Sequence, residues 1–208
     1  MAGKSPLKKV RLVLWAVVAL AAVVSGTILL GQVQQAARQG ADLPGAKLLG
    51  GDFTLTRANG DTFSSAELKG HPYILFFGFT HCPDICPTTL LEITKHLEAV
   101  GPAADNLKVL FVSVDPERDT PESMAQYMSS FDPRIIGLTG TPEQITKVGK
   151  LYRAFYEKVP QEGGDYTMNH TATVFLFDAN GALQSTLSWQ EDEATREAKI
   201  KRLVGANS

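Results

Sequence analysis

The chain has 208 residues, of which 44% are hydrophobic, 20% are charged and two are cysteines. This composition is too apolar for a disordered protein. Two cysteines are too few for a disulfide-dense scaffold or a four-cysteine zinc or iron–sulfur site. The formal net charge of −2 does not indicate nucleic-acid binding, and no nucleic-acid partner is expected.

The near-neutral charge is an average over two unlike parts. The first 41 residues contain five of the 20 Lys and Arg residues and none of the 22 Asp and Glu residues. The remaining 15 basic and 22 acidic side chains give the rest of the chain a net charge of −7. The sequence therefore has a short basic head and an acidic body.

A membrane anchor is predicted directly after this head. Residues 12–30, LVLWAVVALAAVVSGTILL, contain no charge, and a helix of that length spans roughly 28 Å, about the thickness of a bilayer core. The cations before it favour a cytoplasmic N-terminus. Cleavage at Ser25-Gly26 is the alternative. We expect four parts, namely a head at 1–11, a transmembrane anchor at 12–31, a tether at 32–49 and a folded domain at 50–208.

The folded domain alternates strand and helix signals. Continuous apolar runs predict buried strands, Asn-Gly pairs predict hairpins, and Thr-Pro-Glu segments predict helix starts. The expected elements are a hairpin of 53–55 with 61–63, a strand at 73–77, a helix at 87–100, a strand at 107–114, a helix at 120–130, a short strand at 135–136, a helix at 141–156, a hairpin of 173–177 with 182–187, and a helix at 194–204. This order predicts an α/β fold with a mixed sheet and helices on both faces.

Both cysteines lie in residues 78–87, GFTHCPDICP, between the first buried strand and the first long helix. Ligands of α/β sheets bind at the carboxyl ends of strands, where this loop lies. With Pro87 expected at the first helical position, Cys86 would stand at or beside the helix N-cap, where the dipole stabilises its thiolate. Cys82 precedes it by four residues, so both sulfurs are expected on one face.

The Cys-x-x-x-Cys spacing differs from the Cys-x-x-Cys of thioredoxin-type redox pairs. The extra residue relaxes the loop and favours a shared metal ion, and after rearrangement the spacing also suits a disulfide. The alternatives without a functional role are a structural disulfide and two inert buried thiols. A reactive pair is preferred because thiols at a helix N-terminus are more often reactive than inert.

A soft metal bound by two thiolates needs a third ligand, and the chain has four histidines. His96 falls inside the long helix, about 15 Å along its axis from Cys86, and is expected on the surface. His71 lies in a turn. His81 adjoins Cys82, and successive side chains point apart, so a metal shared by these two is strained.

His170 is placed differently because it directly precedes the strand at 173–177. It comes near the cysteines if that strand pairs with the central one, and it is otherwise an ordinary loop histidine. Met168 is a soft thioether candidate, but a core methionine is the preferred reading.

Three segments together resemble one known family. They are residues 78–87, residues 113–122 (SVDPERDTPE), and Asp165-Tyr166 with His170 ahead of a strand ending at Asp178. With the apolar N-terminal run, they resemble the Sco/SenC family of membrane-anchored, thioredoxin-fold copper proteins. The resemblance covers about residues 50–205.

The resemblance implies a thioredoxin-like α/β fold with an extra N-terminal hairpin, preceded by one transmembrane helix. It also implies a copper site, for Cu(I) or Cu(II), whose ligands by position are Cys82, Cys86 and His170. Thiolates match soft Cu(I), and imidazole accommodates either state. Two positions depart from the family pattern: Asn169 stands where Asp is usual, and His71 where Lys is common.

By resemblance, the chain is a metallochaperone that delivers copper to the binuclear copper centre of cytochrome c oxidase. Its partners would be the copper-centre subunit of the oxidase and another copper chaperone as donor. It would be a single-pass inner-membrane protein, with its domain in the periplasm or the mitochondrial intermembrane space. One alternative is a membrane-anchored thiol-disulfide reductase that keeps the oxidase copper-ligand cysteines reduced, with Cys82 and Cys86 as catalytic residues. A redox sensor or peroxidase, and a binding module with a structural disulfide, are further alternatives.

Two carboxylates near the cysteines have open roles. Asp84 lies between the cysteines and either assists copper loading or stabilises the loop. Asp115 follows the second buried strand. It is read as a turn-and-cap residue, with a role beside the site as the alternative.

Overall fold

The computed structural model describes residues 14–15, 49–188 and 190–205. The predicted head, nearly all of the predicted anchor and the tether up to residue 48 lie outside this part of the chain. No helix within the described residues is long and apolar enough to span a membrane.

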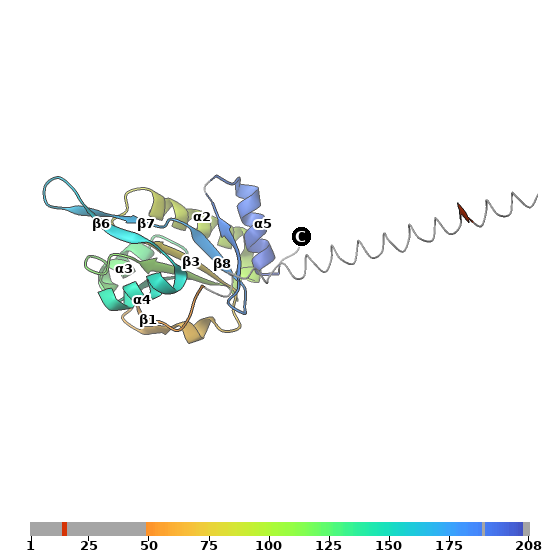
Figure 1. Ribbon diagram of the computed structural model, residues 1–208, viewed down its shortest axis with the longest axis horizontal. Coiled ribbons are helices and arrows are strands. Elements are labelled where there is room, and N and C mark those ends of the chain that lie inside the picture. Colours follow the sequence, from red (N-terminus) through yellow and green to blue (C-terminus); the bar gives the residue numbers. More distant parts are fainter. Residues whose placement is uncertain (1–13, 16–48, 189, 206–208) are drawn as a thin grey trace, which may run out of the picture. The chain divides into compact units, whose positions relative to one another are not determined.

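A seven-stranded mixed sheet forms the centre of the folded domain (Figure 1). Its strand order is β2-β1-β5-β4-β3-β8-β9. The strands β3, β4 and β5 are parallel, whereas β8 runs antiparallel to β3 and β1 antiparallel to β5. Their bounds are β1 Thr54–Arg57, β2 Thr62–Ser64, β3 Tyr73–Gly78, β4 Lys108–Ser113, β5 Ile135–Thr139, β8 Val174–Phe177 and β9 Leu183–Leu187.

Helices cover both faces of this sheet, as predicted. Figure 1 shows α2 (Ile85–Val100) and α5 (Glu193–Leu203) on one face, and α3 (Pro121–Met128) and α4 (Pro142–Tyr152) on the other. All six residues of β3 are therefore buried, as expected for a strand covered on both faces. Two short 3-10 helices, η2 (Ser65–Leu68) and η3 (Gly101–Ala104), complete the elements around the sheet.

The helix α4 starts where the sequence predicts but ends earlier. The Thr141 side chain accepts from the backbone N–H of Gln144, and the Gln144 side chain accepts from the backbone N–H of Thr141. These two bonds complete the predicted capping box. The helix ends at Tyr152 and does not reach the expected Tyr156. Arg153 adopts a left-handed conformation with φ of 52°, and the backbone N–H of Ala154 turns back to the carbonyl of Gly149.

The start of α2 also differs from the prediction. The helix begins at Ile85 with Asp84 as N-cap, so Pro87 is its third residue. Proline is tolerated there because the first N–H groups of a helix have no intrahelical partner. Cys86 thus lies inside the first turn.

An element that the sequence did not predict is the hairpin of β6 (Tyr156–Pro160) and β7 (Tyr166–His170). No element was expected for residues 157–172. The two strands form a separate two-stranded sheet, and Figure 1 shows this hairpin extending beyond the body of the domain. Five of its ten strand residues are exposed and only Met168 is buried, so it lacks the apolar pattern of a core strand.

The chain enters the described domain at the amino end of β3. There the backbone N–H of Gly50 donates to the carbonyl of Leu151 at 2.8 Å. The buried hydroxyls of Tyr73 and Tyr152 hydrogen-bond at 3.2 Å beside it.

Candidate metal site

The loop with both cysteines follows the carboxyl end of β3, as predicted. The neighbouring strand β8 runs antiparallel to β3, with Phe76 opposite Val174. The amino end of β8 therefore lies at the same sheet edge as the cysteine loop. Only three residues separate His170 from Val174, so this pairing brings His170 to the cysteines.

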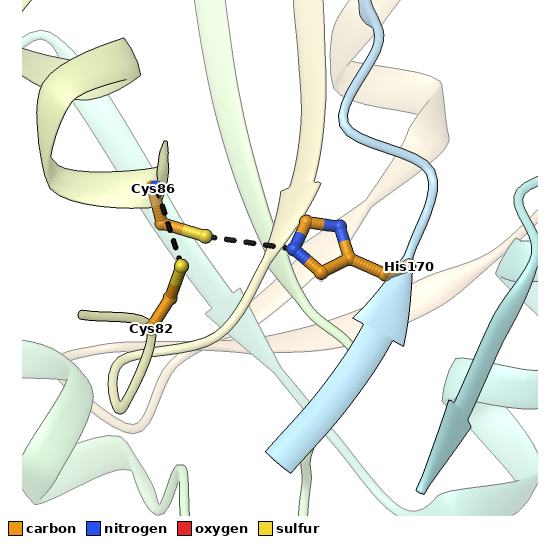
Figure 2. A group of neighbouring side chains, drawn as sticks. All are labelled: Cys82, Cys86 and His170. Atoms are coloured by element: carbon orange, nitrogen blue, oxygen red, sulfur yellow. Dashed lines mark hydrogen bonds between the residues drawn. The ribbon is translucent and has the colours of Figure 1, made fainter. Parts of the chain in front are cut away.

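Three side chains converge at this edge (Figure 2). One ligand atom each of Cys82, Cys86 and His170 lies within 4.8 Å of the other two. The Sγ of Cys86 is 3.6 Å from Nε2 of His170, and the Cys86 backbone N–H donates to Sγ of Cys82 at 3.4 Å. The expectation that places His170 beside the cysteines is confirmed.

The His170 ring is held in one tautomer. Its Nδ1 lies 3.1 Å from the carbonyl oxygen of Thr171. Because a carbonyl only accepts, Nδ1 carries the proton in the neutral ring, and the lone pair of Nε2 points towards the sulfurs. The ring also meets Phe79 edge to face at 5.7 Å and Phe76 at 6.4 Å. The imidazole is thus oriented as a ligand.

The two thiols differ in environment, and neither forms a disulfide. The hydrogen bond from the Cys86 thiol, with smaller contributions from two backbone N–H groups, lowers the pKa of the half-buried Cys82 to about 3. The hydrogen bond with Cys82, together with complete burial, raises the pKa of Cys86. The helix start was expected to stabilise the Cys86 thiolate, whereas burial and the hydrogen bond with Cys82 raise the pKa of this thiol.

The position of Cys86 depends on a glycine. A Cβ atom added to Gly78 would lie 2.6 Å from Cε2 of Phe111 and 2.9 Å from Sγ of Cys86. Any side chain at this position would push the thiol or the ring away, since such close contacts are not tolerated in a packed core.

A buried carboxylate fastens the start of the cysteine loop. Asp119 is 0% exposed. Its Oδ2 accepts from the backbone N–H of Thr80 at 3.0 Å and from the Ser113 hydroxyl at 2.5 Å, and its Oδ1 accepts from the Thr80 hydroxyl at 2.6 Å. Charge-assisted bonds of this kind compensate for the burial of the charge. Asp119 thus ties the loop to the end of β4.

The other histidines lie apart from the three-residue cluster. His81 is half exposed, with Nδ1 3.6 Å from Oδ1 of Asp119. His71 contacts Asn106. His96 is only 3% exposed, so its prediction as a surface histidine is wrong. It faces Glu92 on its own helix and α5, whose charged sequence hides the fact that it covers α2.

The remaining candidates have structural contacts. Met168 is buried in the core, as the preferred reading predicts. Asp84 is exposed, and its side chain accepts only a long bond of 3.4 Å from the Thr88 hydroxyl in the described part of the chain. Asp115 is buried and accepts from Tyr166 and Arg118. The amide of Asn169, at the position that departs from the family pattern, donates to Glu157 on the adjacent strand.

Sequence reasoning did not single out three residues that shape this site. Gly78, Arg118 and Asp119 all fall inside the two longer motifs. Their individual roles depend on contacts between β3, β4 and β7 that form only in the folded protein. The signal available in the sequence was their presence in the motifs.

The fold and the site define an α/β protein with a mixed sheet and a two-thiol, one-imidazole cluster suited to a soft metal ion. Residues 41–205 match the SCO1/SenC family. The chain belongs to that family, and its fold is the thioredoxin-like fold of Sco proteins.

Individual relatives agree with this assignment. The SCO2-like protein of Rickettsia felis is 42% identical over 135 residues, which cover 64% of this chain and 66% of that protein. The human "Protein SCO1 homolog, mitochondrial" is 39% identical over 141 residues, covering 66% of this chain and 46% of that protein. The chain thus spans about two thirds of the first relative's length and less than half of the second's.

A solved structure matches more completely. The structure of Bradyrhizobium japonicum ScoI with copper bound is 48% identical, covers 74% of this chain and 99% of that one, and superposes with a TM-score of 0.70.

Proposed function

We propose that the chain binds one copper ion through Cys82, Cys86 and His170 and delivers it to the binuclear copper centre of cytochrome c oxidase. The observation that carries this proposal is the convergence of the three ligand atoms within 4.8 Å. A relative that is 48% identical is described with copper bound. The acceptor is inferred from the family to which the chain belongs.

The donor set suits copper cargo. Two thiolates match the soft Cu(I) ion, and a neutral imidazole accommodates Cu(I) and Cu(II). With Cu(I) the ion and its ligands carry a net charge of −1, and with Cu(II) the net charge is zero. Cys82 is the more exposed thiol, so an incoming acceptor ligand reaches it first, and the ion passes over by stepwise exchange of ligands.

A second candidate is a thiol-disulfide reductase, and the reactive state of Cys82 favours it. A Cys82 thiolate attacks a partner disulfide and forms a mixed disulfide. Cys86 then loses its proton to the released partner thiolate and attacks the Cys82 sulfur, which gives a Cys82–Cys86 disulfide and releases the second partner sulfur as a thiolate that takes a proton from water. Each turnover oxidises both cysteines, so a thiol reductant must restore them.

One experiment separates these candidates. The reduced chain is titrated with Cu(I) in competition with a chelator of known affinity. Cys82→Ala, Cys86→Ala and His170→Ala should each abolish tight binding, the last leaving a weaker two-thiolate site. Unchanged copper affinity in His170→Ala would show that the three-ligand site is wrong. Full turnover of a disulfide substrate by His170→Ala, with no tight copper binding by wild type, would establish the reductase instead.

The location of the chain is part of the proposal. We place residues 12–31 across the inner membrane, with the N-terminus cytoplasmic and the domain in the periplasm or the mitochondrial intermembrane space. The charge-free run and the cations before it support this orientation. The 32–49 tether would then raise the effective concentration of the domain near a membrane-bound acceptor. Fractionation with protease access to the domain in spheroplasts tests it.

A further inference from the structure

The three proposed ligands come from two differently supported pieces. Cys82 and Cys86 lie between β3 and α2, in the main body of the domain. His170 ends β7, and within the described residues β7 pairs only with β6. An isolated two-stranded ribbon is at best marginally stable in water. The position of His170 therefore depends on what fastens this ribbon to the body.

One attachment lies at the base of the ribbon. The backbone N–H of Thr171 donates to the carbonyl of Phe155 at 2.9 Å, and the backbone N–H of Phe155 donates to the Thr171 hydroxyl at 3.0 Å. These bonds continue the β6–β7 pairing past His170, and at the same end the Tyr156 hydroxyl contacts the Thr146 hydroxyl of α4 at 3.1 Å, which attaches the ribbon to the body. Alone, they leave the direction of the ribbon free, because an attachment at one end permits pivoting.

A second attachment lies four residues away, about 13 Å along β7. The Tyr166 hydroxyl donates to Oδ1 of Asp115 at 2.8 Å, and Arg118 Nε donates to Oδ2 of the same carboxylate at 2.5 Å. Arg118 Nη1 donates to the carbonyl of Tyr166 at 2.9 Å, and its guanidinium carbon lies 3.8 Å from the centre of the Tyr166 ring. We call these three residues the Asp115–Arg118–Tyr166 clamp.

The clamp also reaches the imidazole by a second route. The Arg118 guanidinium lies 5.9 Å from the centre of the Phe79 ring, and Phe79 meets His170 edge to face. Two ion pairs also join the ribbon to the body, Arg118 with Asp165 at 3.3 Å and Lys158 with Glu117 at 2.6 Å. Asp165, Lys158 and Glu117 are exposed, and exposed pairs contribute little. The clamp, whose Asp115 carboxylate is buried, is therefore a stronger constraint on the ribbon than these ion pairs.

We propose that this clamp sets the direction of β7 and so holds Nε2 of His170 against the two sulfurs. Arg118 and Tyr166 are positioning residues for the third copper ligand. This inference rests on the proposed copper site. It predicts that weakening the clamp reduces copper affinity only as far as His170 contributes to it.

A double-mutant cycle on the full, reduced chain tests the proposal. Tyr166→Phe removes only the hydroxyl that bonds Asp115. It should weaken Cu(I) binding about tenfold, or about 1.4 kcal/mol, in the wild-type background. It should change affinity less than about twofold in the His170→Ala background. Tyr73→Phe, which removes a buried tyrosine hydroxyl at the other end of β3, should change neither. Equal weakening in both backgrounds, or no weakening in wild type, would overturn the proposal.

A metal-free measurement separates the clamp from the copper site. In hydrogen exchange without copper, the β7 amides of Tyr166→Phe should exchange faster than those of wild type, and those of Tyr73→Phe should not. Faster exchange in a chain whose wild type binds no copper would support the clamp and overturn the proposed function. Unchanged exchange in a chain that binds copper tightly would overturn the clamp alone.

Discussion

The Sγ of Cys86 lies 3.6 Å from Nε2 of His170, although 84 residues separate them in the sequence. This contact depends on β8, which runs antiparallel to β3 and returns the chain to the cysteine loop. The cysteines are local to one loop, whereas the imidazole arrives through strand pairing. The proposed copper site therefore forms only in the folded protein, and the unfolded chain offers at most the two thiols.

The pH dependence of alkylation tests the state of Cys82. Its pKa is lowered to about 3, so the thiolate is present above that pH and is lost only as the pH falls through it. In the metal-free chain, its rate of reaction with iodoacetamide should stay nearly flat from about pH 5 to pH 8. For an ordinary thiol with a pKa of about 8.5, the rate would rise several hundredfold over that range. Mass spectrometry of the modified Cys82 peptide measures the rate.

The neighbouring thiol supplies the control for this prediction. In the Cys82→Ala variant the remaining thiol, Cys86, loses the hydrogen bond that raises its pKa, but it stays buried. Slow alkylation of Cys86 is expected at every pH. A wild-type profile for Cys82 that rises like that of a free thiol would contradict the assignment.

Gly78→Ala should damage the fold and the site together. The new Cβ would meet Phe111 and Cys86, and such overpacking costs about 1–3 kcal/mol of unfolding free energy. Copper affinity should fall as well, because the thiol must move. Gly137→Ala is the matched control: it overpacks β5 against Met124 and Met128, so it should lose similar stability and keep its copper affinity. Urea unfolding and chelator competition measure the two effects, and parallel behaviour of both variants would refute the role of Gly78.

Asp119→Asn should loosen the cysteine loop. The amide keeps the size of the carboxylate but loses its charge and replaces one acceptor oxygen by a donor, which disrupts the bonds from Thr80 and Ser113. We expect a loss of about 2–4 kcal/mol in unfolding free energy, since bonds to charged groups contribute about 1.5–3 kcal/mol each. Ser113→Ala removes one of these bonds and should cost less. If Asp119→Asn unfolds like wild type in urea, the carboxylate does not fasten the loop.

His96 should make the folded protein less stable in mild acid. Desolvation by burial lowers its pKa in the folded protein. As the pH falls below about 6.5, the unfolded chain binds a proton that the folded chain excludes, so the unfolding free energy falls. His96→Leu should show a smaller loss between about pH 7.5 and pH 5.5. Its stability at pH 7.5 should be no lower, because the buried Nε2 has no hydrogen-bond partner among the described residues.

A second histidine variant completes this comparison. His71→Gln removes a histidine outside the core and should leave the acid loss in place. Urea unfolding at the two pH values measures all three proteins. Equal acid loss in wild type and His96→Leu would show that His96 does not cause it.

The elements predicted correctly from the sequence are those with strong local signals. The apolar run of β3 and the capping box at Thr141 each specify their element within a few residues. The hairpin of β6 and β7 carries no such signal, because half of its strand residues are exposed and only Met168 is buried. His96 was wrongly predicted on the surface because it is covered by α5, whose charged sequence does not indicate that it packs on α2.

The site was predictable in part. The cysteine loop is recognisable by its position between strand and helix. The spacing alone left His170 open, and the resemblance to the Sco/SenC family selected it. The charge state of the cysteines could not be predicted, because it depends on which sulfur is enclosed. Cys86 is buried, and Cys82 is only partly buried.

The bond between Gly50 and Leu151 places the arriving chain at the amino end of β3. The sulfurs lie beyond its carboxyl end, roughly 17 Å away along a six-residue strand. Gly50 and the two sulfurs thus lie at opposite ends of β3. A partner that docks over the sulfurs would therefore leave the contact between Gly50 and Leu151 uncovered.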